Sequence, residues 1–199
     1  MGNDVFNTIE KESTGFYSEK GSKFHAFAFP VKSEEEIKEI QHSLRKKYYD
    51  ARHHVYAFVL GADKNTYRAS DDGEPANSSG MPVLGQIRSF DLSNVLIVVV
   101  RYFGGTKLGV PGLINAYKTA AKDALENARI VEEFVTSKGS VHFAYDEMNY
   151  VMKVINDSGA KIVKQEFLAD CEIDFEIRNS EFQRLIESLK RNHKIKVEE

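Results

Sequence analysis

The stretch NVLIVVVRYF at residues 94–103, followed directly by GGTKLGVPGL at residues 104–113, decides the fold of the first half of the chain. Its continuous run of branched apolar residues is typical of a strand buried on both faces. The glycines after it predict a turn, and Pro111 suits the first turn of a helix. One face of that helix is marked by small and apolar residues, namely Leu113, Ala116, Tyr117, Ala120, Ala121, Ala124 and Leu125.

The residues before this strand predict a second strand and a helix. FHAFAFPV at residues 24–31 is dense in aromatic residues, and Pro30 favours a strand that lies at an edge or ends there. Ser33 and Glu36 have the spacing of a capping box, so we expect a helix from there to Tyr48.

A hairpin and a long loop are expected next. Residues 54–61 and 66–70 have the composition of two strands joined by a turn at Gly61. Residues 70–85, SDDGEPANSSGMPVLG, follow neither the helical nor the strand period and predict a loop. Loops of this length inside compact domains are often functional.

Downstream of residue 135 the pattern predicts a separate domain. The expected order of elements is β-α-β-β-α-β, the ferredoxin-like arrangement. Its parts are a strand at 139–146, a helix through Val151, Val154 and Ile155 ended by Gly159, strands at 161–170 and 171–178, a helix capped by Ser180 and Gln183, and a strand at 193–199. The sequence therefore predicts an α+β protein with two domains, residues 1–135 and 136–199.

The composition limits the class of protein. Of 199 residues, 42% are hydrophobic and 29% are charged, which predicts a globular chain. The formal net charge of −3 does not suit a protein that coats nucleic acid over its whole surface, although it leaves room for a local basic patch. The single Cys171 fits a reducing compartment, and residues 1–12 lack the apolar core of a secretory signal. We therefore expect a cytoplasmic protein with no membrane partner.

The glycine turn at residues 104–113 has two interpretations. It is not a Walker loop, because Val110 and Pro111 stand where the lysine and the hydroxyl residue are needed, and it lacks the dinucleotide-binding pattern. Backbone N–H groups at Gly104, Gly105 and Gly109, with Arg101 and Lys107 nearby, would suit an anion. Alternatively, the glycines only provide positive φ angles and close packing.

The acidic loop offers a second candidate site. Asp71, Asp72 and Glu74 are three carboxylates of the kind that bind Mg²⁺, although the same residues are also ordinary turn formers. His54 would face an anion from the start of a strand, or it is simply a polar residue there. Cys171 has no partner in the sequence that would activate it as a nucleophile. No cofactor is expected.

Three segments together resemble the YigZ/IMPACT family: ARHHVYAFVLG at 51–61, YRASDDGEPANSSGMPVLGQI at 67–87 and VLIVVVRYFGGTKLGVPGLINAYKTA at 95–120. The second domain resembles the small C-terminal domain that bacterial members append. The resemblance implies a first domain similar to domain IV of elongation factor G, a ribosomal protein fold of the left-handed β-α-β type. It implies a second domain similar to domain V of the same factor.

The resemblance also carries functional expectations. Eukaryotic members are linked to translational control, where they compete for the activator of an amino-acid-starvation kinase, and the fold implies a nucleic-acid or ribosome role for bacterial ones. The chain departs from the family pattern at residues 76–80, at Pro111 and at Asn115, where an arginine is common. The loss of that arginine weakens a phosphate site at the helix start, for which Lys107 would compensate.

These observations lead to one main hypothesis, a non-enzymatic binding protein in translation or its regulation that contacts RNA, the ribosome or a translation-linked protein. No DNA specificity is expected. The candidate contact residues are His54, Asp71, Asp72, Glu74, Arg101, Gly104, Gly105, Lys107 and Gly109.

Two alternatives remain open. The first is a metal-assisted hydrolase or phosphotransfer enzyme acting on a small phosphorylated substrate. In it Asp71, Asp72 and Glu74 hold the metal, while Arg101 and Lys107 hold the phosphate. The second is a protein-interaction module that binds no nucleic acid.

Overall fold

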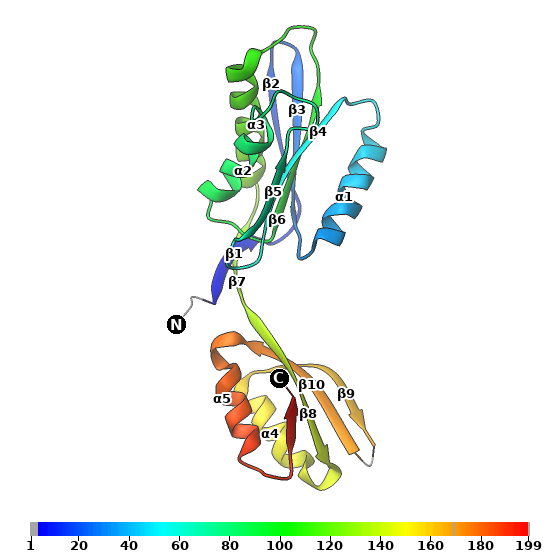
Figure 1. The fold of residues 1–199 in the computed structure, drawn as a ribbon, viewed down its shortest axis with the longest axis vertical. Coiled ribbons are helices and arrows are strands. Elements are labelled where there is room, and N and C mark those ends of the chain that lie inside the picture. The colour runs from blue at the N-terminus through cyan, green and yellow to red at the C-terminus, as the bar shows by residue number, and fades with distance from the viewer. Residues whose placement is uncertain (1–3, 169, 199) are drawn as a thin grey trace. The chain divides into compact units, whose positions relative to one another are not determined.

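The computed structural model describes residues 4–168 and 170–198, and it divides the chain into two compact units (Figure 1). One unit is residues 6–133. The other comprises Asp4 and Val5 together with the described residues from 134 onward. The α+β class with two domains is confirmed. The boundary predicted at residue 135 lies close to this division, but the prediction assigned Asp4 and Val5 to the first domain. The predicted domains and strands also include residues 1–3, 169 and 199, which lie outside the described residues.

The first unit is built on a five-stranded antiparallel sheet, in the order β2(Ser13–Glu19), β3(Ser22–Pro30), β6(Val95–Tyr102), β4(His53–Leu60) and β5(Thr66–Ser70). The central strand β6 is the apolar run of the sequence, and it is buried on both faces as expected. Its alternate residues enter two different hydrophobic clusters, Val95, Ile97 and Val99 on one face and Leu96, Val98 and Val100 on the other.

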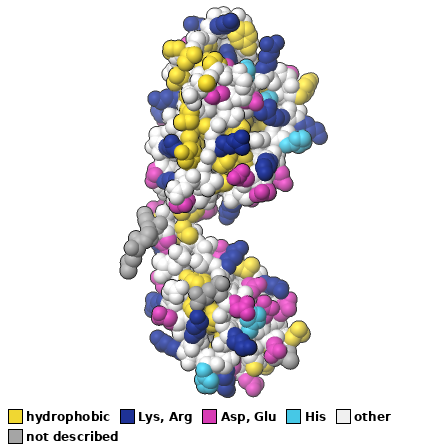
Figure 2. All heavy atoms as spheres, viewed as in Figure 1, with side chains coloured by type: hydrophobic (Ala, Val, Ile, Leu, Met, Phe, Trp, Pro, Cys, Tyr) yellow, Lys and Arg dark blue, Asp and Glu magenta, His cyan; other side chains and the backbone are white. Residues whose placement is uncertain are grey.

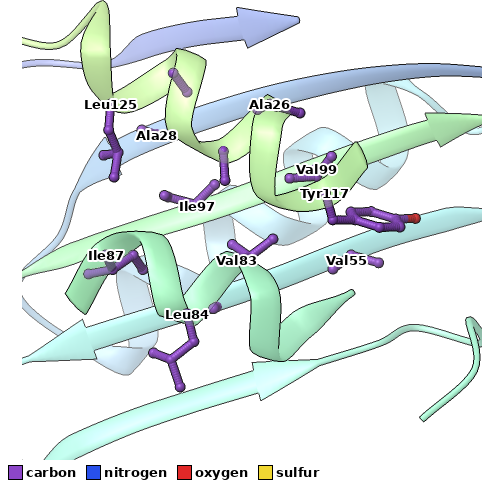
Figure 3. Packing of buried hydrophobic residues seen from close by; sticks show 14 of the residues in the cluster. Ala26, Ala28, Val55, Val83, Leu84, Ile87, Ile97, Val99, Tyr117 and Leu125 are labelled. Carbon is purple, nitrogen blue, oxygen red and sulfur yellow. The ribbon is translucent and has the colours of Figure 1, made fainter. Parts of the chain in front are cut away.

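Helices cover both faces of this sheet. α2(Gly80–Ser89) and α3(Gly109–Glu126) pack on the face of Val95, Ile97 and Val99, and Figure 3 shows their side chains meeting those of the strands. α1(Glu34–Lys47) packs on the other face. Its predicted capping box is confirmed, because the Glu36 N–H donates to Ser33 Oγ and the Lys32 N–H donates to the Glu36 carboxylate.

The sequence-based description of the first unit was incomplete. Of the two alternatives for Pro30, the edge strand is wrong, because β3 is an interior strand, and the strand end is confirmed, because Pro30 is its last residue. The strands β1(Val5–Ile9) and β7(Ile130–Phe134), which pair with each other, and the edge strand β2 were missed. These strands are short or interrupted by polar residues, so their period is weak.

The predicted loop at residues 70–85 is also wrong in its second half. α2 begins within it, at Gly80, although Pro82 and Gly85 reduce the helix propensity. The start of α2 is stabilised by Asp71, whose carboxylate accepts hydrogen bonds from the N–H groups of Ser79 and Gly80. Asp71 precedes Ser79 and Gly80 by eight and nine positions, so this cap leaves no local signature in the sequence.

The second unit has the predicted β-α-β-β-α-β order. Its elements are β8(Thr136–Ala144), a short 3₁₀ turn, α4(Met148–Ser158), β9(Lys161–Phe167), β10(Asp170–Arg178), α5(Asn179–Lys190) and β11(Lys196–Glu198). The strands lie in the order β11-β8-β10-β9, and α4 and α5 close one core with β8 and β10. Gly159 ends α4 with a φ of 73°, as the sequence predicts.

The chain start completes this second unit. The Arg178 guanidinium donates two hydrogen bonds to the Asp4 carboxylate, at 2.7 and 2.8 Å, and the Ser180 N–H donates a third at 3.2 Å. The predicted cap of α5 by Ser180 and Gln183 is therefore wrong, since the helix starts at Asn179 and its first turn is satisfied by Asp4. None of the helices described in the two units is long and apolar enough to cross a membrane.

Candidate functional site

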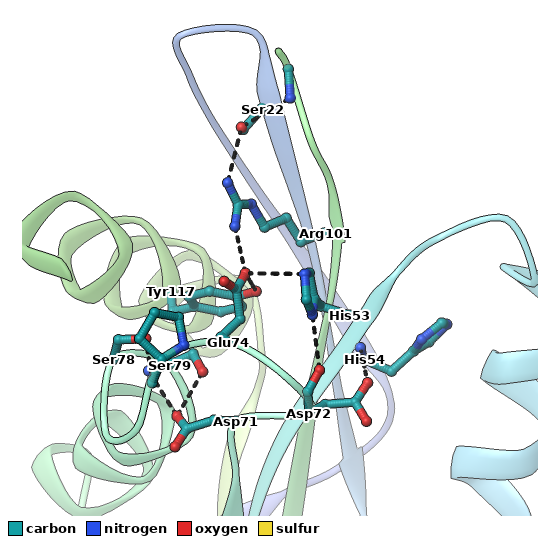
Figure 4. A network of polar contacts seen from close by, with 12 residues as sticks. Ser22, His53, His54, Asp71, Asp72, Glu74, Ser78, Ser79, Arg101 and Tyr117 are labelled. Carbon is teal, nitrogen blue, oxygen red and sulfur yellow. Dashed lines mark hydrogen bonds and ion pairs between the residues drawn. The ribbon is translucent and has the colours of Figure 1, made fainter. Parts of the chain in front are cut away.

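The two motifs singled out in the sequence meet at one end of the five-stranded sheet. β6 ends there at Tyr102, β4 begins there at His53, and β5 ends there at Ser70. The glycine turn after β6 and the acidic loop after β5 therefore leave the sheet at the same end. Figure 4 shows the acidic-loop side chains in polar contact with residues of β3, β4, β6 and α3 at this end.

The Glu74 carboxylate lies at the centre of this network. Its Oε1 accepts hydrogen bonds from Arg101 Nη1 at 2.6 Å and from the Tyr117 hydroxyl at 2.7 Å. His53 Nε2 lies 4.0 Å from the same oxygen. The Glu74 and Arg101 side chains are only 4% and 7% exposed. The charge of Arg101 is thus paired inside the protein and is not presented to a phosphate.

The protonation of Tyr117 follows from its surroundings. Burial, and next the charge of Glu74, raise the pKa of its hydroxyl far above the ordinary value. The hydroxyl therefore stays protonated and donates its hydrogen bond to Glu74 throughout the physiological range.

Arg101 also connects the glycine turn to the hairpin of β2 and β3. Its Nη2 donates to Ser22 Oγ at 3.4 Å, and the same oxygen accepts from the Gly104 N–H at 3.1 Å. The guanidinium carbon lies 5.5 Å from the centroid of Phe24 and 5.6 Å from that of Phe103, so it is flanked by aromatic rings. The network therefore links the acidic loop, β6, α3 and this hairpin by hydrogen bonds at one end of the unit.

Asp71 has a structural position at the start of α2. One carboxylate oxygen accepts from the N–H groups of Ser79 and Gly80 at 3.0 and 2.8 Å and from the Ser79 hydroxyl at 2.7 Å. The other oxygen accepts from the Asn77 N–H at 2.8 Å. Burial raises the pKa of Asp71, but these hydrogen bonds outweigh burial and lower it. The helix start, where an external anion would bind, already holds a carboxylate of the protein.

Asp72 links the acidic loop to α1 and β4. Its carboxylate accepts from Arg45 Nη2 at 2.7 Å and from the His54 backbone N–H at 2.6 Å. Its backbone oxygen lies 2.8 Å from His53 Nδ1. Burial raises the pKa of the Asp72 carboxyl, and the hydrogen bond from Arg45 outweighs it, so the net shift is downward. Asp72 is therefore an ionised carboxylate that is already paired.

The three carboxylates of the acidic loop consequently have separate partners and do not converge on one point. Within residues 4–168 and 170–198, no group of three or more His, Cys, Asp or Glu side chains is arranged to hold a metal ion. The geometry thus opposes the alternative in which Asp71, Asp72 and Glu74 bind a metal, because protein groups already satisfy each of them.

The glycines of the turn have structural explanations. A Cβ atom on Gly104 would lie 1.9 Å from the carbonyl carbon of Gly21, so only glycine allows this close approach. Gly105 and Gly109 have φ angles of 87° and 72°, which L-residues with side chains seldom adopt. Lys107, on the same turn, is exposed.

The two neighbouring histidines take different faces of β4. His53 lies opposite Arg101 and joins the network, whereas His54 lies on the α1 face and its ring points away from Glu74 (Figure 4). Burial lowers the pKa of His54 below its ordinary value and so favours the neutral ring. Sequence reasoning chose His54 and missed His53. The available signal was the alternation along β4, which places His53 on the same face as Val55 and Ala57.

Exposed basic side chains surround this network. We call them the basic end; they are Lys20, Lys23, Lys46, Lys47, Arg52 and Lys107. Within the part of the chain that the structure describes, none of them is in an ion pair with a carboxylate. Figure 2 shows Lys and Arg side chains at this end of the first unit, at the top of the view.

The register of the sheet places Lys20 and Lys23 of the basic end close to the turn that follows β6. Lys23 is paired with Tyr102, and Lys20 precedes Gly21, which contacts Gly104. The Tyr102 hydroxyl donates to Asp50 at 2.8 Å, which attaches the segment between α1 and β4 to the same end.

A family model and a solved structure match this chain. The family model described as Impact N-terminal domain matches residues 20–125, a range that contains the whole network around Glu74. A solved structure titled "Crystal structure of an hypothetical protein" superimposes with a TM-score of 0.78 at 24% identity, covering 99% of this chain and 98% of that one, which shows the shared fold.

Named relatives carry the same assignment. The chain is 31% identical over 152 residues to IMPACT family member YigZ of Escherichia coli (strain K12), covering 75% of this chain and 74% of the relative. It is 36% identical over 111 residues to IMPACT family member YvyE of Bacillus subtilis (strain 168), covering 56% of this chain and 51%, about half, of that protein. It is 36% identical over 116 residues to the Protein IMPACT homolog of Saccharomyces cerevisiae, covering 56% of this chain and 44% of the relative. The chain belongs to the IMPACT family.

Proposed function

We propose that this protein is a non-enzymatic RNA-binding protein that acts in translation or its regulation, and that the basic end holds the RNA phosphates. The observation that carries the proposal is a concentration of exposed, unpaired basic side chains at one end of a unit, in a chain whose formal net charge is −3. Such local concentration of positive charge is the electrostatic footprint of a nucleic-acid contact.

Two carboxylates of the acidic loop do not cancel this charge, although Glu19 and Asp50 also lie at this end. Glu74 is buried against Arg101, and Asp72 is paired with Arg45. The lysines of the basic end are therefore available to phosphates, whose contacts release condensed counterions from the RNA.

The network supports a binding role in preference to catalysis. Glu74, Tyr117 and His53 are types of residue that transfer protons in enzymes, but here Glu74 and Tyr117 contact each other within a buried cluster that also contains Arg101. Of the residues predicted from the sequence, Lys107 is the one that we assign to RNA contact. The other candidate residues hold the backbone segments that carry the basic end in place. The chain belongs to the IMPACT family, and the link of that family to translational control supports a role in translation.

The experiment measures the anisotropy of labelled RNA against salt concentration, from about 50 to about 300 mM. It compares the wild type with the double variant Lys20→Gln, Lys107→Gln. The matched control is Lys32→Gln, Lys38→Gln, since these exposed lysines flank the start of α1, at the opposite end of the sheet. We expect the slope of log K against log salt to fall by about 0.7 for each phosphate contact removed in the first variant, and to stay unchanged in the control.

Other outcomes would redirect the proposal. An absence of RNA binding at the lowest salt would overturn it. If a cell extract treated with nuclease still yields a specific partner on the immobilised protein, a translation-linked protein replaces RNA as the ligand. Equal slopes in both variants would remove the basic end from the contact.

A further inference from the structure

A row of three aromatic rings crosses neighbouring strands at the basic end, on the α1 side of the sheet. Phe16 of β2 is paired with His25 of β3, and their ring centroids are 5.0 Å apart. The Tyr102 ring of β6 is next, 6.1 Å from His25 with an interplanar angle of 89°. Edge strand, neighbouring strand and central strand thus each place one ring on the same face.

α1 covers only a part of that face. Its buried side chains Ile37 and Leu44 share a cluster with residues of β4 and β6. Phe16, on the edge strand, is 48% exposed, and His25 and Tyr102 are partly exposed. The edge-strand end of the row, at Phe16, is therefore open to solvent, whereas Tyr102 packs in part against the cluster of Ile37 and Leu44.

A hollow adjoins this row. It has a volume of about 510 Å³, its aromatic lining residues are Phe16, His25, Phe27 and Tyr48, and its lining also includes the Asp123 carboxylate, which accepts a hydrogen bond from the Phe16 N–H. The rings of Phe27 and Tyr48 lie 5.3 Å apart and extend the aromatic surface toward the end of α1. Phe16 is 48% exposed although its ring contacts His25, and together with the aromatic lining of the hollow it forms a contiguous apolar surface of the kind that marks binding sites.

Positive charge borders the same rings. Lys23 is paired with Tyr102 and lies on the same face, and Lys47 Nζ lies 5.3 Å from the centroid of Tyr48. Lys20 lies in the turn between β2 and β3. Aromatic platforms flanked by lysines are the common means of binding single-stranded nucleic acids, because every base has a face that stacks.

We propose that the row of Phe16, His25 and Tyr102 stacks unpaired bases, so that the protein binds single-stranded RNA in preference to duplex RNA. The inference rests on the proposed function: the lysines of the basic end hold the phosphates, and the aromatic row selects strands whose bases are free. Bases within a duplex are already stacked and cannot reach the rings.

Two further observations agree with this assignment. Burial, and next the charge of Lys23, lower the pKa of His25, so its ring is neutral at physiological pH and offers a stacking surface. The sheet of the second unit carries the opposite charge on its open face, because the side of β10 away from the core presents Glu172, Asp174 and Glu176. Acidic side chains in that position repel phosphates.

The test uses the full chain and three probes: a labelled single-stranded RNA of about 12 nucleotides, the same sequence as a duplex, and inorganic polyphosphate, which has no bases. The variant is Phe16→Leu, which keeps an apolar side chain of similar size but removes the aromatic face. The matched control is Tyr67→Leu, since Tyr67 is 52% exposed on β5, the other edge strand of the same sheet.

The expected result is a loss of about tenfold in the affinity of Phe16→Leu for single-stranded RNA. Its affinity for polyphosphate should match that of the wild type, and Tyr67→Leu should bind all three probes normally. Because the chain contains no tryptophan, Phe16→Trp supplies a direct signal. Its fluorescence should be quenched by single-stranded RNA and unaffected by polyphosphate.

The failure of this inference can be separated from that of the proposed function. Salt-dependent RNA binding that is equal for single strands and duplex, or that Phe16→Leu leaves unchanged, overturns base stacking and retains phosphate binding. If neither RNA nor polyphosphate binds at low salt, the proposed function fails and the inference fails with it. Circular dichroism of each variant shows whether it is folded, so that a loss of RNA affinity is not mistaken for a loss of folding.

Discussion

Glu74 Oε1 and Arg101 Nη1 lie 2.6 Å apart, with both side chains almost completely buried, although the two residues are separated by 27 positions in the chain. One belongs to the loop after an edge strand and the other to the central strand. Because Tyr117 of α3 donates to the same carboxylate oxygen, a single acidic side chain holds three segments of the first unit together.

Replacing Glu74 with Gln should strongly destabilise the first unit. The amide preserves the size of the side chain, but it leaves the Arg101 guanidinium buried without a counter-charge, at a cost of about 3 kcal/mol in the free energy of unfolding. Chemical denaturation measures this cost. The control is Glu35→Gln, an exposed position in the first turn of α1, for which a change of about 0.5 kcal/mol or less is expected. Equal stabilities of the two variants would contradict the role of the pair.

Neighbouring glycines of the turn should respond differently to alanine. A Cβ at position 104 would lie 1.9 Å from the carbonyl carbon of Gly21 and 2.1 Å from the Ser22 nitrogen, so Gly104→Ala forces two backbone segments apart and should cost about 3 kcal/mol or more. Gly105→Ala meets no neighbour and costs only the strain of a φ of 87°, about 1 kcal/mol. Thermal denaturation of both variants checks this order, and a reversed order would refute the close approach.

Asp71 should make the stability of the first unit depend on pH in the acidic range. Its pKa in the folded state lies below the ordinary value of 3.8, so its contribution is fully present above that value. The contribution is lost as the pH falls through the lower folded pKa, because the protonated carboxyl no longer accepts the N–H groups at the start of α2. Denaturation of the wild type and of Asp71→Asn between about pH 2 and pH 6 should show a weaker pH dependence in the variant. Parallel curves of stability against pH for the wild type and Asp71→Asn would contradict this role of the Asp71 carboxylate.

Asp4 should stabilise the second unit and not the first. Its carboxylate accepts two hydrogen bonds from Arg178 and one from the Ser180 N–H, so Asp4→Ala should lower the unfolding temperature of that unit. Hydrogen exchange resolves the two units. Faster exchange in α5 and β10, with unchanged exchange in β6, is the expected pattern, and uniform acceleration in both units would refute the assignment.

The elements that could be predicted from the sequence are those whose information is local. β6 and α3 each carry their own period, and the start of α1 carries its own capping box. α2 was missed because its cap comes from Asp71, and because Pro82 and Gly85 conceal its helical period.

The site required information that no local pattern contains. The meeting of Glu74 with Arg101 depends on the order of the strands, which places β6 between β3 and β4. Alternation along β4 predicts that His53 and His54 face opposite sides, but only the packing of the helices decides which side holds the network. The aromatic row depends in the same way on the register between β2 and β3.

The pairing of Asp4 with Arg178 makes the first unit an insertion within the second. During synthesis Asp4 is made 174 positions before its partner, while the inserted residues 6–133 are already contiguous and complete. Domains fold as units while the chain is being made. The inserted unit is therefore able to fold first, and the second unit closes on the beginning of the chain only when β10 has been made.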